Sequence, residues 1–181
     1  ALALVLSACG GDDDSTQSTA DDTETTDETT ADTVAGDDTD TDKVDVPEDI
    51  CALVSGEAVG AVLGETVEAR DVPGGGCQYA GGTAASLYPT ITVAEDADGA
   101  GGIDGARAGA EGAVSGTAED LTVQSHDGYV VTGAVMGSTS SQGALAVDGL
   151  IVTVSVAGGE AASNAAAITE LLDLTVTALT G

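Results

Sequence analysis

The side chains best suited to chemistry in this 181-residue chain are three cysteines, Cys9, Cys51 and Cys77, and a single histidine, His126. A thiol can form a disulfide, carry a covalent modification or bind a metal ion, and an oriented imidazole can act as a general base. What each of them does depends on the segments around it, and those segments differ sharply along the chain.

His126 precedes Asp127, and the serines Ser125, Ser138 and Ser141 are close enough in sequence to suggest a hydrolase triad. A triad is defined by geometry rather than by composition, and the chain has no Gly-x-Ser-x-Gly nucleophile elbow. We therefore predict that His126 lies in a turn and has no catalytic role.

Two acidic runs have the alternating carboxylates of a calcium loop. The first, Asp38–Asp42, is followed by Lys43 where such a loop needs glycine. The second, Glu95–Gly99, lacks both end ligands when its glycine is set at the sixth position. The three glycines at 74–76 lack the Lys-Ser/Thr of a phosphate-binding loop. The sequence therefore predicts solvated acidic segments, a flexible turn, and no metal or cofactor.

Cys9 closes the sequence Leu6-Ser7-Ala8-Cys9, which ends an apolar run that starts at Ala1. This pattern resembles the lipobox of bacterial lipoproteins. The resemblance implies that residues 1–9 are a signal-peptide remnant and that Cys9 carries a diacylglyceryl group with palmitate-like acyl chains. Because the chain begins without Met or a basic segment, we expect it to be truncated at its N-terminus. The alternative is a buried segment that happens to end in cysteine.

Lipidation of Cys9 would leave Cys51 and Cys77 as a pair, which should be oxidised outside the cytoplasm. A disulfide between them would stabilise the fold by roughly 3.5 kcal/mol in the chain-entropy model. It would also leave too few Cys and His side chains for a zinc site. Two free buried thiols are the alternative.

The formal net charge is −29, with 32 acidic and three basic residues. This charge repels phosphate backbones, so we predict no nucleic-acid partner. Half of the acidic residues, 16 of 32, precede Cys51. Residues 10–46 are rich in Asp and Thr and nearly free of large apolar side chains. We therefore expect a disordered acidic tether in front of an extracytoplasmic domain at 47–181.

The start of this domain combines several short motifs. Cys51-Ala52-Leu53-Val54 leads into a helix that ends in Val62-Leu63-Gly64, and a glycine-rich turn at 73–76 is followed by Cys77-Gln78-Tyr79. This order resembles the beginning of the actinobacterial lipoprotein family DUF3558. The resemblance implies a location, a fold and a pairing of Cys51 with Cys77, and it implies no particular chemistry.

Local signals place several elements in the first half of the domain. Ser55 is a suitable N-cap for a helix that Gly64 would end. Leu87–Val93 alternates as a strand, and Pro89 within it favours an edge position. The Ala- and Gly-rich segment 103–114 is predicted to be a helix.

The second half has a clearer pattern. Strands are predicted at 121–123 and 129–136 with a turn at 126–128, and Asp148-Gly149 predicts a type I′ hairpin. Residues 160–179 have apolar side chains at helical spacing. This order predicts an α+β domain with helices packed on one face of an antiparallel sheet. The recurrence of a helix followed by strands suggests two similar halves.

Together these features predict a lipid-anchored protein on the outer face of the cytoplasmic membrane. It would present a small, non-enzymatic binding or interaction domain at the cell surface. Its expected partners are the membrane, through the lipid, and an envelope protein or small ligand of unknown identity. The alternative is a carrier of a small hydrophobic or lipid ligand across the envelope.

Overall fold

The computed structural model of the chain describes residues 45–82, 87–97 and 101–181, which belong to one compact unit. Cys9, the signal-peptide remnant at 1–9 and nearly all of the tether at 10–46 therefore lie outside the described residues. Within the described ranges, no helix combines the length and the apolar character that crossing a membrane requires.

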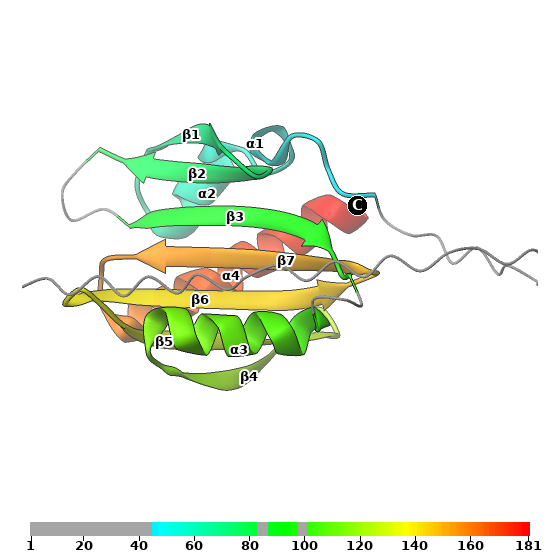
Figure 1. Cartoon of the computed structure of the whole chain (residues 1–181). Coiled ribbons are helices and arrows are strands. Elements are labelled where there is room, and N and C mark those ends of the chain that lie inside the picture. The colour runs from blue at the N-terminus through cyan, green and yellow to red at the C-terminus, as the bar shows by residue number, and fades with distance from the viewer. Residues whose placement is uncertain (1–44, 83–86, 98–100) are drawn as a thin grey trace, which may run out of the picture. The chain divides into compact units, whose positions relative to one another are not determined.

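Seven antiparallel strands form one sheet in the order β1-β2-β3-β7-β6-β5-β4 (Figure 1). The strands are β1 (Val67–Val72), β2 (Gly76–Gly81), β3 (Tyr88–Glu95), β4 (Thr117–Val123), β5 (His126–Val135), β6 (Ser138–Val147) and β7 (Leu150–Ala157). The helices are α1 (Ile50–Leu53), α2 (Gly56–Leu63), α3 (Gly102–Val114) and α4 (Ala161–Thr180). The chain thus builds two meanders, β1–β3 and β4–β7, which join where β3 pairs with β7.

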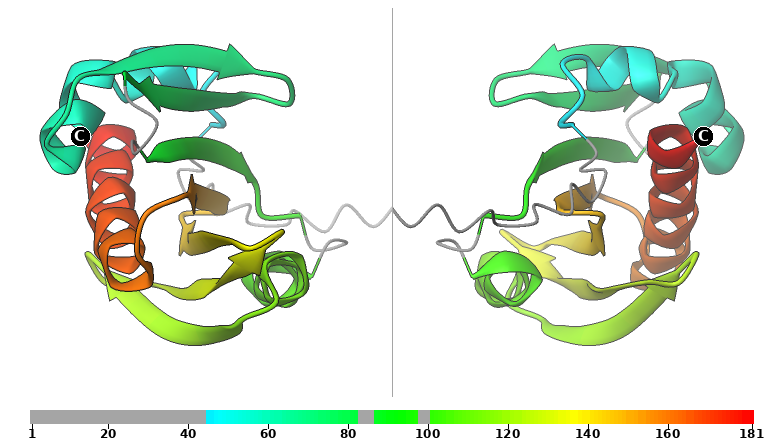
Figure 2. Two further views of the ribbon diagram at one scale, coloured as in Figure 1. Left: turned by 90° about the vertical axis from the view of Figure 1, so that its left-hand side faces the viewer. Right: turned by 90° about the vertical axis from the view of Figure 1, so that its right-hand side faces the viewer.

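The helices cover both faces of the sheet, as the end-on views in Figure 2 show for α3 and α4. The larger core lies between the sheet and α1, α2 and α4, and includes Tyr79, Leu145 and Ile168. A smaller core, with Val114 and Tyr129, lies between α3 and the opposite face. The predicted α+β class with an antiparallel sheet is confirmed, but the placement of all helices on one face is wrong for α3.

The strand sequences explain this two-sided arrangement. Successive side chains of a strand point to opposite faces. In β6, Leu145 belongs to the larger core and its neighbour Ala144 to the smaller one. The two halves do share the order of a helix followed by a meander, but α2 and α3 pack on opposite faces, so the halves are not equivalent.

β3 lies inside the sheet between β2 and β7, so the edge position expected from Pro89 is wrong. β2 pairs with β3 only where Gly76–Gln78 opposes Thr90–Thr92. Pro89 is one residue beyond that ladder and pairs on the other side with Val156. A proline is tolerated in this inner strand because the neighbouring ladder has already ended.

Two of the three hairpin turns in the second half differ in how well the sequence indicates them. Asp148 and Gly149 both have positive φ, 46° and 84°, which confirms the predicted turn. The β4–β5 turn lies at Gln124 and Ser125, with φ of 49° and 73°, two residues before the predicted one. Gly128 lies inside β5, where a Cβ atom would overlap the carbonyl oxygen of Ala144.

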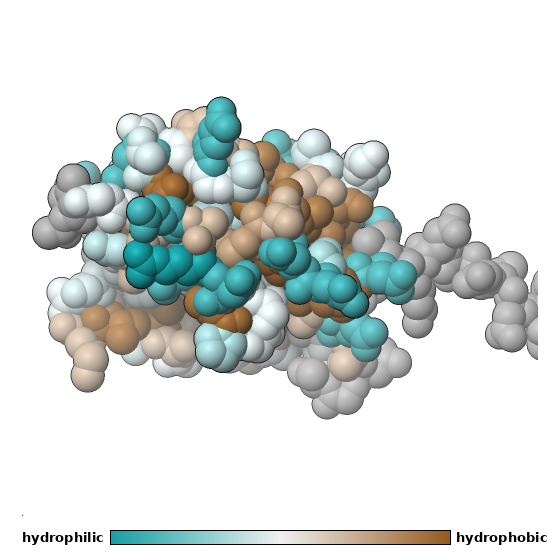
Figure 3. Space-filling view, turned by 90° about the horizontal axis from the view of Figure 1, so that it is seen from above, coloured by the Kyte–Doolittle hydropathy of each residue, from teal (hydrophilic) through white to brown (hydrophobic). Residues whose placement is uncertain are grey.

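Both edge strands carry charge. β1 exposes Glu68, Arg70 and Asp71, and β4 exposes Glu119 and Asp120. Seen from above, from the side on which β1 lies, the surface shows hydrophilic side chains close to hydrophobic ones (Figure 3). Charged side chains on an edge strand disfavour pairing with a strand of another molecule.

Candidate functional site

The disulfide between Cys51 and Cys77 joins α1 to β2. Its S–S distance is 1.96 Å and its Cα–Cα distance is 5.1 Å. The predicted pairing is confirmed, and the alternative of two free thiols is wrong. Asp49 caps α1 by accepting a hydrogen bond from the amide of Ala52 at 2.8 Å, so this short helix begins at Ile50, one residue before Cys51.

Two exposed carboxylates, those of Asp49 and Asp71, lie beside this disulfide. Ligand atoms of Asp49, Cys51 and Asp71 are within 4.8 Å of one another. The Cys51 sulfur is bonded to Cys77, so it is not a thiolate that could bind a metal ion. The remaining two carboxylates are a solvated pair. The structure describes residues 95–97 of the acidic run at 95–99 but not its last two residues. The whole of the run at 38–42 lies outside the described residues.

His126 begins β5 and pairs with Val123 across the turn. The side chain of Ser141 is fully buried and shares a 2.8 Å hydrogen bond with the hydroxyl of Thr132. Ser125 lies in the β4–β5 turn, and Ser138 is exposed at the start of β6. The structure therefore places these serines in three different settings, and the hydroxyl of Ser141 already has a partner other than His126.

Arg107 is the centre of a recess that the sequence does not single out. Its guanidinium donates to the carboxylate of Asp120 at 2.6 Å and to the carbonyl of Gly128 at 3.2 Å. The same guanidinium lies 5.6 Å from the centre of the Tyr129 ring. It thereby ties α3 to the β4–β5 hairpin through an ion pair, a hydrogen bond and a cation–π contact.

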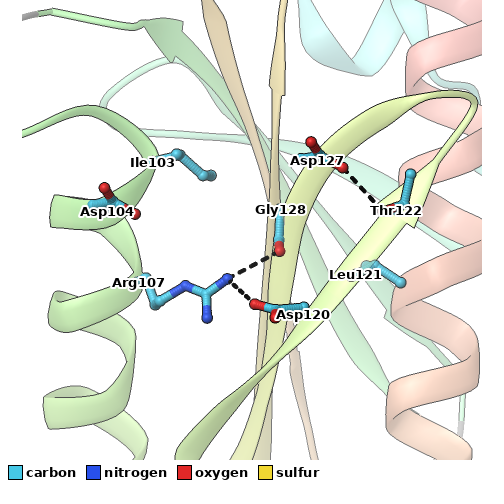
Figure 4. A pocket seen from close by; sticks show the side chains of 8 residues that line it. All are labelled: Ile103, Asp104, Arg107, Asp120, Leu121, Thr122, Asp127 and Gly128. Carbon is cyan, nitrogen blue, oxygen red and sulfur yellow. Dashed lines mark hydrogen bonds and ion pairs between the residues drawn. The ribbon is translucent and has the colours of Figure 1, made fainter.

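The recess around Arg107 has a volume of about 470 Å³. Figure 4 shows its lining residues, which are Ile103, Asp104, Arg107, Asp120, Leu121, Thr122, Asp127 and Gly128. Asp127 accepts a hydrogen bond from the hydroxyl of Thr122 at 3.0 Å. With three carboxylates and one guanidinium, the lining is net negative, and it would favour a ligand rich in hydrogen-bond donors.

Two buried tyrosines, Tyr79 and Tyr129, have pKa values that are raised above the ordinary value of a phenol. Burial raises the pKa of Tyr79 to about 12, and the nearby Asp49 carboxylate contributes in the same direction. Burial also raises the pKa of Tyr129, while the hydrogen bond from Gln142 and the charge of Arg107 act against that rise. Both phenols therefore stay protonated at neutral pH.

A second recess, which we call the α2–α4 groove, lies between α2, the end of β4 and α4. Its volume is about 620 Å³, and its lining residues are Val62, Thr122, Val123, Gln124, Thr169, Glu170, Asp173, Leu174 and Thr177. Neither recess could be found from the sequence, because each combines residues that are far apart in the chain. The one hint is that Arg107 is one of only three basic residues in the sequence.

The chain was compared with known proteins at three levels. No protein-family model matches it, and neither a curated protein nor a solved structure does so.

Proposed function

We propose that this protein is a lipid-anchored extracytoplasmic protein that presents a small binding domain at the cell surface. The lipid would be attached at Cys9, and the family resemblance to DUF3558 lipoproteins points to the same location. The partner of the domain would be an envelope protein or a small ligand, and the mode of action would be binding rather than catalysis.

The observation that carries this proposal is the disulfide between Cys51 and Cys77. Disulfides persist in oxidising compartments outside the cytoplasm. The bond also uses two of the three cysteines, so Cys9 is the odd one, at the end of a lipobox-like sequence. An odd cysteine in an exported protein calls for a separate role, and lipidation supplies one.

The surface of the domain supports a role in binding. The Arg107 recess and the α2–α4 groove are both open to solvent, and both have acidic lining residues. By contrast, the space between the sheet and α4 is filled by fully buried side chains such as Leu145, Ile168 and Leu172. The alternative, a carrier of a small hydrophobic or lipid ligand, would need an internal cavity in place of these side chains.

The proposal can be tested by expressing the chain in a bacterial host behind a Met and a basic segment, with labelled palmitate in the medium. We expect label in the protein and recovery in the membrane fraction, and we expect Cys9→Ala to abolish both. Ser15→Ala, a change six residues away, serves as the matched control. If Cys9→Ala stayed in the membrane fraction with its label, lipidation at this position would be excluded.

A further inference from the structure

We propose that the α2–α4 groove binds a cationic amphipathic segment of a partner protein. This inference rests on the proposed function, because it names the kind of partner that such an interaction domain would take. An aliphatic side chain of the segment would contact the floor of the groove, and a Lys or Arg would lie at its rim.

The floor of the groove is apolar. Val62 comes from α2, Val123 from the end of β4 and Leu174 from α4. Val62 and Leu174 are half-buried, while Val123 is only 6% exposed. Three aliphatic side chains from three separate elements thus form one surface, on which an apolar side chain would lose contact with water.

The rim of the groove is acidic. Glu170 and Asp173 lie on the exposed side of α4, and no basic residue is among the lining residues. Both arginines of the described ranges are engaged elsewhere, Arg70 with Glu68 and Arg107 with Asp120. The negative charge of this rim is therefore not balanced by an arginine within the described part of the chain.

One wall of the groove is held in a strained conformation. Gln124 and Ser125 both have positive φ although neither is glycine, which costs free energy. The side-chain amide of Gln124 donates to the carbonyl oxygen of Asp173 at 3.3 Å, to its carboxylate at 2.8 Å and to the hydroxyl of Thr177 at 2.8 Å. These bonds fix the turn against α4, so the groove is already formed before a partner arrives.

Charge complementarity selects the occupant. An acidic rim around an apolar floor fits a helix with aliphatic residues on one face and Lys or Arg beside them, a common mode of peptide recognition. A second copy of this chain fits poorly, because it has 32 acidic and three basic residues. The same overall charge would speed the approach of a basic partner at low ionic strength.

The test uses the 181-residue chain and two synthetic helical peptides. One has leucines at positions i, i+3, i+4 and i+7 with lysines elsewhere, and the other has the same leucines with glutamates. We expect calorimetric titration to show binding of the Lys/Leu peptide and none of the Glu/Leu peptide. Equal binding of both peptides would overturn the proposal.

Two matched pairs of variants distinguish binding in the groove from attraction of the peptide to the overall negative charge. Glu170→Gln should weaken binding about 2- to 5-fold through loss of one exposed ion pair. Glu160→Gln removes the same charge from the residue before α4, outside the groove lining, and should have no comparable effect.

Val62→Thr should weaken binding about 4-fold, as expected for one buried methyl group. Its control is Val135→Thr, at an exposed valine of β5, and circular dichroism checks that all variants fold.

If Glu170→Gln and Glu160→Gln weaken binding equally, the peptide recognises net charge and the groove is not its site. The outcome of the peptide titration does not depend on whether Cys9 carries a lipid. A chain that is lost from the membrane but binds the peptide through Glu170 and Val62 would overturn the lipid attachment only. A membrane-bound chain that does not bind the Lys/Leu peptide would overturn the groove alone.

Discussion

Tyr79 links β2 to the end of α1 by a buried hydrogen bond. Its hydroxyl donates to the carbonyl oxygen of Val54 at 2.6 Å, and its side chain is fully buried. Tyr79→Phe would leave that carbonyl without its partner, so we expect a loss of about 1–3 kcal/mol in the free energy of unfolding. Urea denaturation followed by circular dichroism measures it.

Tyr129→Phe is the matched control for that substitution. Tyr129 is also fully buried, but among the described residues its hydroxyl has only a long hydrogen bond, accepted from Gln142 at 3.5 Å. We expect the control to cost less than Tyr79→Phe. An equal cost would mean that the Tyr79 hydrogen bond contributes nothing beyond packing.

The raised pKa of Tyr79 also predicts how stability depends on alkaline pH. An unfolded tyrosine loses its proton near pH 10, whereas folded Tyr79 keeps it up to about pH 12. Between these values the unfolded state binds fewer protons than the folded state, so stability falls as pH rises. We expect Tyr79→Phe to fall less steeply across this window in denaturation at stepped pH. A slope unchanged from the parent chain would contradict the assignment.

At the scale of single residues, the sequence predicts the disulfide but not the contacts between distant side chains. The pairing of Cys51 with Cys77 follows once Cys9 is assigned to lipidation, because only two cysteines then remain. The contacts of Arg107 and Gln124 could not be predicted, since their partners lie 13 to 53 residues away and depend on how α3 and α4 pack.

Two glycines in different helices predict opposite effects of the same substitution. At Gly60 in α2, a Cβ atom would lie 2.5 Å from the carbonyl oxygen of Glu65, whereas at Gly109 in α3 it would meet open space. Gly60→Ala should destabilise the domain by about 1–3 kcal/mol, because backbone must move. Gly109→Ala should stabilise it by up to about 1 kcal/mol through helix propensity. Thermal unfolding of both variants tests this, and stabilisation by Gly60→Ala would show that α2 does not pack so closely.

Elements with strong local signals could be predicted from the sequence, and those set by their neighbours could not. Ser55 and Gly64 bound α2 as expected, with Ser55 accepting a hydrogen bond from Ala58 and Gly64 in the left-handed region. The Gln124–Ser125 turn has no residue that favours positive φ, and it depends on bonds to α4. Likewise, the position of β3 depends on where β2 ends, which Pro89 alone cannot indicate.

For the whole molecule, the disulfide should matter more than any single contact described above. It encloses 26 residue steps, and the chain-entropy model assigns it roughly 3.5 kcal/mol. We expect Cys51→Ser combined with Cys77→Ser to lower the free energy of unfolding by about that amount. Cys9→Ser should leave it unchanged. A double variant as stable as the parent would show that the core alone holds α1 against β2.

The net charge of −29 predicts a dependence of stability on salt. Repulsion among like charges disfavours the compact state. Between about 0.01 M and about 1 M salt, the Debye length falls from about 30 Å to about 3 Å. We therefore expect the melting temperature to rise with NaCl concentration. A fall over this range would mean that ion pairs such as Arg107–Asp120 outweigh the repulsion.

The disulfide between α1 and β2 also determines how the domain would respond to mechanical force. A pull on the chain at Asp45 reaches Cys51 after six residues and then passes through the sulfur bridge to β2. The intervening residues, 52–76, which include α2 and β1, bear no load while the bridge is intact. The oxidised domain should therefore extend less than the reduced one by 25 residues at about 3.5 Å each, or about 90 Å. If the N-terminal segment tethers this domain to a membrane, as proposed above, the bridge would keep residues 52–76 out of the path of any force on that tether.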